Sequence, residues 1–145
     1  MENLLTVVII AIVAGLAVTL QSNFMGVMTQ LMGARESVFI TYGSGGLIIS
    51  LFLLISGGGK LAAWRTVPPY AFTAGILGLI IVGLLGYATA RYGLVVTFTV
   101  LLIAQYGSAV LIDHFGLMGA AVRPVDSLRL LGIALLLVGA WLTLR

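Results

Sequence analysis

Cysteine is absent from this chain of 145 residues, and only 8% of its residues are charged. Without cysteine there are no disulfides and no thiolate chemistry, so cysteine usage gives no redox compartment. A soluble domain carries about a quarter charged residues. This chain is instead 61% hydrophobic, with a mean hydropathy of +1.24. The composition therefore predicts an integral membrane protein.

Titratable side chains are equally scarce, with one histidine and four carboxylates. They are too few for a clustered metal site, so neither a metal nor another cofactor is expected. No serine is placed with the histidine and a carboxylate as a nucleophile site would require, which argues against an enzyme. The net charge of +3 is spread along the chain, so nucleic acid is not an expected partner. The N-terminal Met-Glu-Asn lacks the basic region of a signal peptide, so the first helix is expected to be retained.

Five apolar segments are long enough to suggest membrane spans. They cover residues 4–32, 37–55, 70–90, 94–112 and 127–144. Each is near the ~20 residues that a spanning helix needs, the last being the shortest. Lipid excludes open sheets, and these runs are too long for barrel strands. We therefore expect an all-α membrane protein, with a single five-helix transmembrane domain over residues 1–145. Because five is odd, its termini would lie on opposite sides of the membrane.

The basic residues are divided almost evenly between the two predicted sides. The side of the N-terminus collects Lys60, Arg65, Arg123 and Arg129, and the opposite side collects Arg35, Arg91 and Arg145. Orientation follows a bias in such charges, and this bias is small. One interpretation is that the chain inserts both ways round and pairs as an antiparallel homodimer. The alternative is one fixed orientation, set by a partner or by the short loops.

Polar side chains fall within the predicted spans. In the first helix, Gln21, Met25 and either Met28 or Thr29 recur on one face. In the fourth, Gln105 lies near the middle, with Tyr106 beside it. The second helix adds a face of hydroxyl side chains: Ser37, Thr41 and Ser44. Polar groups at mid-membrane are functional candidates, although such groups also hold helices together.

The acidic residues all lie at predicted helix ends: Glu2, Glu36, Asp113 and Asp126. A proton-exchange mechanism based on a carboxylate in the middle of a helix is therefore not expected. Asp113 and His114 close the fourth predicted helix. They can serve as a loop anchor, with Arg123 or Arg129 available to pair with the aspartate, or as a pH-sensitive gate, since histidine titrates near neutrality.

Three short motifs resemble the YdcZ-type proteins, small five-helix members of the drug/metabolite transporter superfamily. They are Gln21 with Met25 and Thr29-Gln30, the run Leu111-Ile112-Asp113-His114-Phe115-Gly116, and Gly139-Ala140-Trp141-Leu142. The resemblance covers the whole chain, and the Ile-Asp-His-Phe-Gly run is its most specific part. It implies transport by superfamily membership, an antiparallel dimer, and a bacterial inner (plasma) membrane.

These observations predict a small-molecule transporter that works as an antiparallel homodimer with a site near the bilayer midplane. The residues expected to line the site are Gln21, Met25, Gln105 and Tyr106. The expected partners are the lipid bilayer, a second copy of the chain and an unidentified small solute. The alternative is a membrane subunit or scaffold that does not transport and uses its polar faces to dock another protein.

Overall fold

The computed structural model describes residues 3–145, and α-helices and short 3₁₀ turns are the only regular secondary structure in that range. This confirms the predicted all-α class. The first helix, α1 (Leu4–Met32), begins at Asn3, whose side chain accepts a hydrogen bond of 3.3 Å from the amide of Leu5. At 1.5 Å per residue, α1 is about 45 Å long. Because this exceeds the ~30 Å hydrocarbon core, α1 must tilt or project from it.

The second helix, α2 (Ala34–Ile55), follows α1 after one residue. That residue, Gly33, has φ = 104°, a backbone conformation that glycine adopts without steric cost. The chain can therefore turn without a longer linker, and α2 begins three residues before the predicted residue 37. Glu36 lies in its first turn, where a negative charge interacts favourably with the helix dipole.

Two 3₁₀ turns, η1 (Leu61–Thr66) and η2 (Pro69–Thr73), lead into α3 (Ala74–Phe115). The 42 residues of α3 would measure about 63 Å as a straight helix, twice the hydrocarbon thickness. Its backbone is broken at Gly93, where φ is 78° and ψ is 171°. Residues 74–92 and 94–115 therefore form two helical legs, in the regions where the sequence predicts separate helices over 70–90 and 94–112.

The last α-helix, α4 (Ser127–Thr143), follows the short 3₁₀ turn η3 (Leu117–Gly119) and an extended loop. Asp126 caps it, since the aspartate side chain accepts a 2.7 Å hydrogen bond from the amide of Arg129. Within residues 3–145, α1, α2 and the run Pro69–Phe115 are long and apolar enough to cross a membrane, and α4 is a shorter apolar helix.

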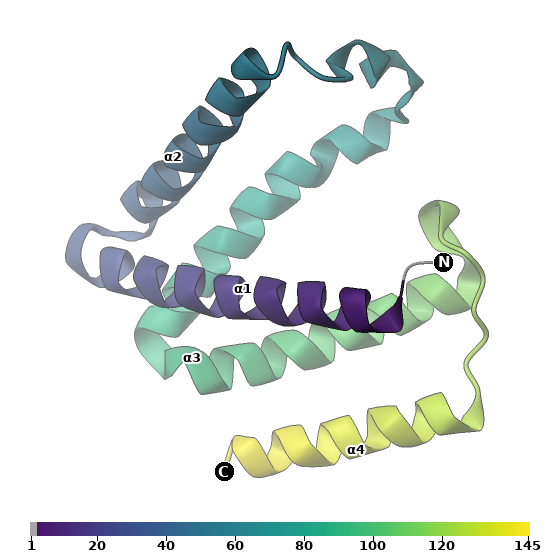
Figure 1. Ribbon diagram of the computed structural model, residues 1–145. Coiled ribbons are helices and arrows are strands. Elements are labelled where there is room, and N and C mark those ends of the chain that lie inside the picture. The colour runs from purple at the N-terminus through teal and green to yellow at the C-terminus, as the bar shows by residue number, and fades with distance from the viewer. Residues whose placement is uncertain (1–2) are drawn as a thin grey trace. The chain divides into compact units, whose positions relative to one another are not determined.

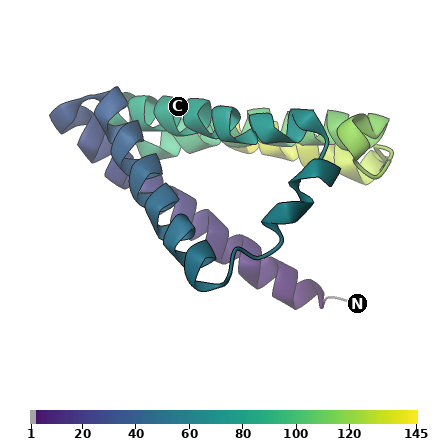
Figure 2. The ribbon, with the colours of Figure 1, turned by 90° about the horizontal axis from the view of Figure 1, so that it is seen from above.

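The chain divides into two compact units after Arg91. The N-terminal unit contains α1, α2 and the first leg of α3, and the C-terminal unit (Tyr92–Arg145) contains the second leg and α4. In the N-terminal unit, the turn at Gly33 joins α1 and α2 at one end, and the first leg of α3 passes close to it (Figures 1 and 2). The placement of all five helices in a single domain stays a prediction.

Candidate functional site

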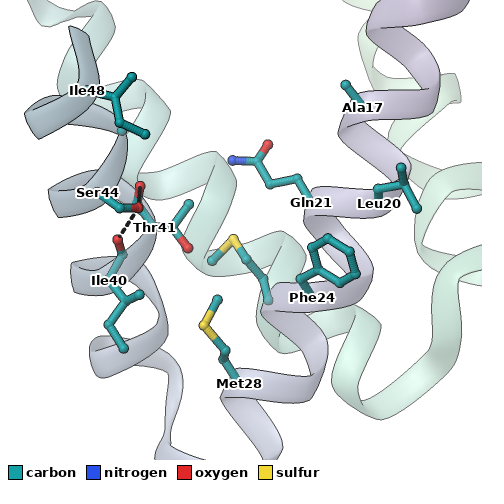
Figure 3. A pocket seen from close by; sticks show the side chains of 11 residues that line it. Ala17, Leu20, Gln21, Phe24, Met28, Ile40, Thr41, Ser44 and Ile48 are labelled. Atoms are coloured by element: carbon teal, nitrogen blue, oxygen red, sulfur yellow. Dashed lines mark hydrogen bonds between the residues drawn. The ribbon is translucent and has the colours of Figure 1, made fainter.

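A cavity of about 490 Å³ lies between α1 and α2 in the N-terminal unit. Both helices supply its wall, as Figure 3 shows. The lining residues are Ala17, Leu20, Gln21, Phe24, Met25 and Met28 from α1, and Ile40, Thr41, Ser44, Gly45 and Ile48 from α2. None of these side chains is charged. Two of the four predicted site residues, Gln21 and Met25, therefore lie in the wall of one cavity.

The side chain of Gln21 points from α1 toward the hydroxyl groups of Thr41 and Ser44 on α2 (Figure 3). Among residues 3–145 it has no hydrogen-bond partner. An amide left unpaired in hydrocarbon costs several kcal/mol, roughly 2–7 depending on the reference state. Its two donors and its carbonyl acceptor are thus available to a ligand or a partner.

The hydroxyl groups of α2 turn their donors away from the cavity. The Oγ1 atom of Thr41 donates to the carbonyl of Ser37 at 2.8 Å, and the Oγ atom of Ser44 donates to the carbonyl of Ile40 at 2.7 Å. A hydroxyl has one proton and two lone pairs, so what remains for a ligand is acceptor capacity. This side of the cavity suits a solute that brings its own N–H or O–H donors and carries no negative charge.

Two methionines, Met25 and Met28, form part of the cavity wall. Met25 is only 2% exposed, and its backbone carbonyl accepts a 3.3 Å hydrogen bond from the Oγ atom of Ser37 on α2. Unbranched thioether side chains adapt to irregular shapes, so Met25 and Met28 can fit apolar bodies of different form. Thr29, the alternative to Met28 on this predicted face, turns instead toward Gly86 of α3.

A row of polar contacts behind the cavity holds α1 against the first leg of α3. The Oγ atom of Ser22 and the Oγ1 atom of Thr89 share a 2.9 Å hydrogen bond, and the Nε2 atom of Gln30 donates to the carbonyl of Ala90 at 2.9 Å. The sequence reasoning missed the role of Ser22 and Thr89. The spacing of Ser22 and Gly26 was the available signal, because small residues four apart mark close helix contacts in membranes.

Gln105 and Tyr106 lie in the C-terminal unit, on the second leg of α3, and both side chains are exposed. All residues that line the Gln21 cavity come from the N-terminal unit. The C-terminal unit has a cavity of its own, of about 230 Å³, between the second leg and α4. It is lined by Thr99, Leu102, Ile103, Leu136, Gly139, Ala140 and Thr143. The assignment of Gln105 and Tyr106 to a substrate site stays a prediction.

Asp113 and His114 contact the loop that leads to α4. The Nδ1 atom of His114 accepts a 3.2 Å hydrogen bond from the amide of Val125, and the carbonyl of Asp113 accepts one of 2.8 Å from the amide of Arg123. The guanidinium of Arg129 donates to the carbonyl of Arg123 at 3.1 Å. Asp113 thus meets Arg123 through backbone atoms. These contacts are of the kind that a loop anchor makes, and the pH-sensitive gate stays a hypothesis. Of the four acidic residues at predicted helix ends, Glu2 lies outside the described residues.

Comparison with known families decides what this membrane fold belongs to. Residues 6–142 match the family described as "putative inner membrane exporter, YdcZ". The chain belongs to the YdcZ family. It is an integral protein of the inner membrane, and the family description supports a transporter. No match was found among curated proteins or among solved structures.

Proposed function

We propose that this YdcZ-family protein exports a small, weakly polar solute and works as an antiparallel homodimer. The observation that carries the proposal is the unpaired amide of Gln21, which faces a cavity of about 490 Å³ between two membrane helices. The alternative is a subunit that only docks a partner. It needs no cavity open to water, so the two differ in a measurable property.

The position of Gln21 along α1 supports a site near the bilayer midplane. The centre of the helix Leu4–Met32 is Val18, and Gln21 is three residues further, about 4.5 Å along the axis. Polar side chains at this depth are costly and mark substrate pathways in membrane proteins.

The balance of basic residues supports the antiparallel dimer, as it did in the sequence. Two copies in opposite orientations would be related as the inverted repeats of many transporters are, with the site between equivalent halves. Alternating access then follows from an exchange of roles between the halves. In this arrangement Gln105 and Tyr106 would complete the wall that Gln21 and Met25 begin.

The wall chemistry indicates the class of solute. Thr41 and Ser44 present acceptors, Gln21 presents donors and an acceptor, and the remainder is apolar. An amine, alcohol or amide with an apolar body satisfies these groups. A carboxylate would be left facing lone pairs with only the Gln21 amide to stabilise its charge.

The dimer is tested by topology, using the absence of native cysteine. A single cysteine is added after Arg145, and intact cells are treated with a membrane-impermeant thiol reagent. Labelling of about half of the molecules, rising to all after permeabilisation, is expected from dual topology. Labelling of all or none of the molecules in intact cells would contradict the antiparallel homodimer.

The cavity is tested separately with Gln21→Cys in purified protein reconstituted in bilayers. We expect it to react with a water-soluble thiol reagent. Leu16→Cys is the matched control, because Leu16 is exposed on the same helix and does not line the cavity. Equal resistance of both cysteines would favour the docking subunit over the transporter.

A further inference from the structure

A second groove, of about 580 Å³, lies in the N-terminal unit between the start of α2 and the first leg of α3. It is lined by Ala34, Arg35, Val38, Gly83, Leu84 and Tyr87. It shares no residue with the cavity that contains Gln21. The proposed transport site therefore does not explain it.

Two arginines are associated with this groove, Arg35 as a lining residue and Arg91 through its contact with the Tyr87 ring. Arg35 is the second residue of α2 and lines the groove together with Tyr87. The guanidinium carbon of Arg91 lies 4.4 Å from the centre of the Tyr87 ring, a cation–π contact that holds its charge in place. Among residues 3–145, neither guanidinium forms an ion pair with a carboxylate. Within the described residues, the positive charges of Arg35 and Arg91 are therefore not held in ion pairs.

The rest of the groove is apolar and extends away from these charges. Val38 lies one turn from Arg35 along α2, and Leu84 lies about two turns from Arg91 along α3. Because Gly83 has no side chain, it leaves a hollow beside Val38. A Cβ atom at Gly83 would fit there, since it would stand 3.5 Å from the Cγ2 atom of Val38, which is an ordinary contact. Both arginines lie close to helix ends, Arg35 in α2 and Arg91 before the break at Gly93. We expect such ends at the membrane interface, with the apolar part of the groove within the hydrocarbon.

We propose that this groove binds an anionic phospholipid of the surrounding bilayer. The phosphate would lie between the guanidinium groups of Arg35 and Arg91, since guanidinium binds phosphate with paired hydrogen bonds. One acyl chain would lie along Val38 and Leu84, over the hollow at Gly83. Basic pockets between membrane helices bind acidic head groups by the same electrostatics, and the two charges select such a lipid over a zwitterionic one.

The test is native mass spectrometry of the full chain, purified in micelles that contain equal amounts of phosphatidylglycerol and phosphatidylcholine. We expect adducts of phosphatidylglycerol to predominate. Arg35→Gln and Arg91→Gln should each lower these adducts about fivefold, since a basic residue near the surface contributes about 1 kcal/mol to binding acidic lipid. Arg65→Gln is the matched control, because Arg65 lies over the Trp64 ring, 5.6 Å from its centre, but does not line the groove. It should leave the adducts unchanged.

The acyl-chain part is tested with Gly83→Leu, which fills the hollow while both arginines remain. It should reduce adducts of phosphatidylglycerol, whereas Gly83→Ala, whose Cβ fits, should retain them. The arginine variants still decide the proposal if Gly83→Leu does not fold. Equal adducts of the two lipids, or an equal loss in Arg65→Gln, would overturn it. So would loss of dimer mass rather than lipid mass in Arg35→Gln, which would identify a second copy as the occupant.

Discussion

The two units of the chain use their polar side chains in different ways. In the N-terminal unit, Thr41 and Ser44 bond within α2, but other polar side chains join separate helices, through Ser22 with Thr89 and through Gln30 with Ala90. In the C-terminal unit, Thr97, Ser108 and Thr143 donate to carbonyls of their own helices.

A hydroxyl that bonds within its own helix adds nothing to the contact between helices, whereas one that bonds across a contact specifies which faces meet. We therefore expect polar side chains to determine the helix packing more strongly in the N-terminal unit than in the C-terminal unit. The C-terminal unit has polar groups that are not used between its helices, and the proposed dimer would employ them. Four predictions follow, from the largest expected effect to the smallest; two stay within one unit, and two compare the units directly.

Gln21→Leu should abolish export, because it removes the one side-chain amide that the described residues place in the wall of the cavity. The measurement is the tolerance of producing cells to growth-inhibiting amines, alcohols and carboxylates. We expect tolerance to amines or alcohols in the wild type and none in the variant, with the dimer intact. Asn23→Leu is the control, since Asn23 is an exposed amide on the same helix that does not line the cavity. A fully active Gln21→Leu would refute the assignment.

Gly86→Leu should destabilise the N-terminal unit, because a Cβ atom at Gly86 would already lie 3.1 Å from the Oγ1 atom of Thr29. Overpacking of this kind costs about 1–3 kcal/mol. The measurement is the free energy of unfolding in detergent. Gly107→Leu, in the C-terminal unit, is the control, since a Cβ atom there has no neighbour within 4 Å. Equal losses in both variants would contradict the proposed difference between the units.

His114→Phe should loosen the loop before α4, because phenylalanine keeps a ring but has no acceptor for the amide of Val125. Loss of one hydrogen bond corresponds to about 1 kcal/mol, or about a fivefold lower protection of that amide against hydrogen exchange. Unchanged protection in the variant would exclude the anchor.

Ser22→Ala and Thr89→Val should show a coupling of about 0.6 kcal/mol in a double-mutant cycle, the mean for such contacts in membranes. Thr143→Val in the C-terminal unit should couple to neither, since its hydroxyl bonds to the carbonyl of Gly139 in its own helix. The readout is again the free energy of unfolding. No coupling between Ser22 and Thr89 would show that their hydrogen bond does not specify the helix contact.

Much of the fold was accessible from sequence patterns. The helix predicted over residues 4–32 is observed as Leu4–Met32, and the one predicted over 127–144 as Ser127–Thr143. The prediction was wrong at Ala34–Glu36, which lie before the predicted start at residue 37 and instead begin α2. Gly33 alone makes the turn between α1 and α2, through a backbone angle that side-chain hydropathy does not report.

The candidate site was only partly accessible from the sequence. Helical periodicity brought Gln21 and Met25 onto one face, and both line the cavity. Periodicity does not say which helix that face meets. Met28 and Thr29 were equivalent in the pattern, yet Met28 lines the cavity and Thr29 lies against Gly86.

The hydropathy and the low charge of the sequence by themselves place these segments in a membrane. They must then be helices, because in lipid each backbone N–H and C=O group has to find its hydrogen-bond partner within its own segment. That requirement is local, so the order and type of the elements follow from the chain itself. The direction of each polar side chain is not local. Whether Ser22 bonds to Thr89, or Gln30 to the carbonyl of Ala90, depends on how closely two helices approach, and only packing of distant segments decides that distance.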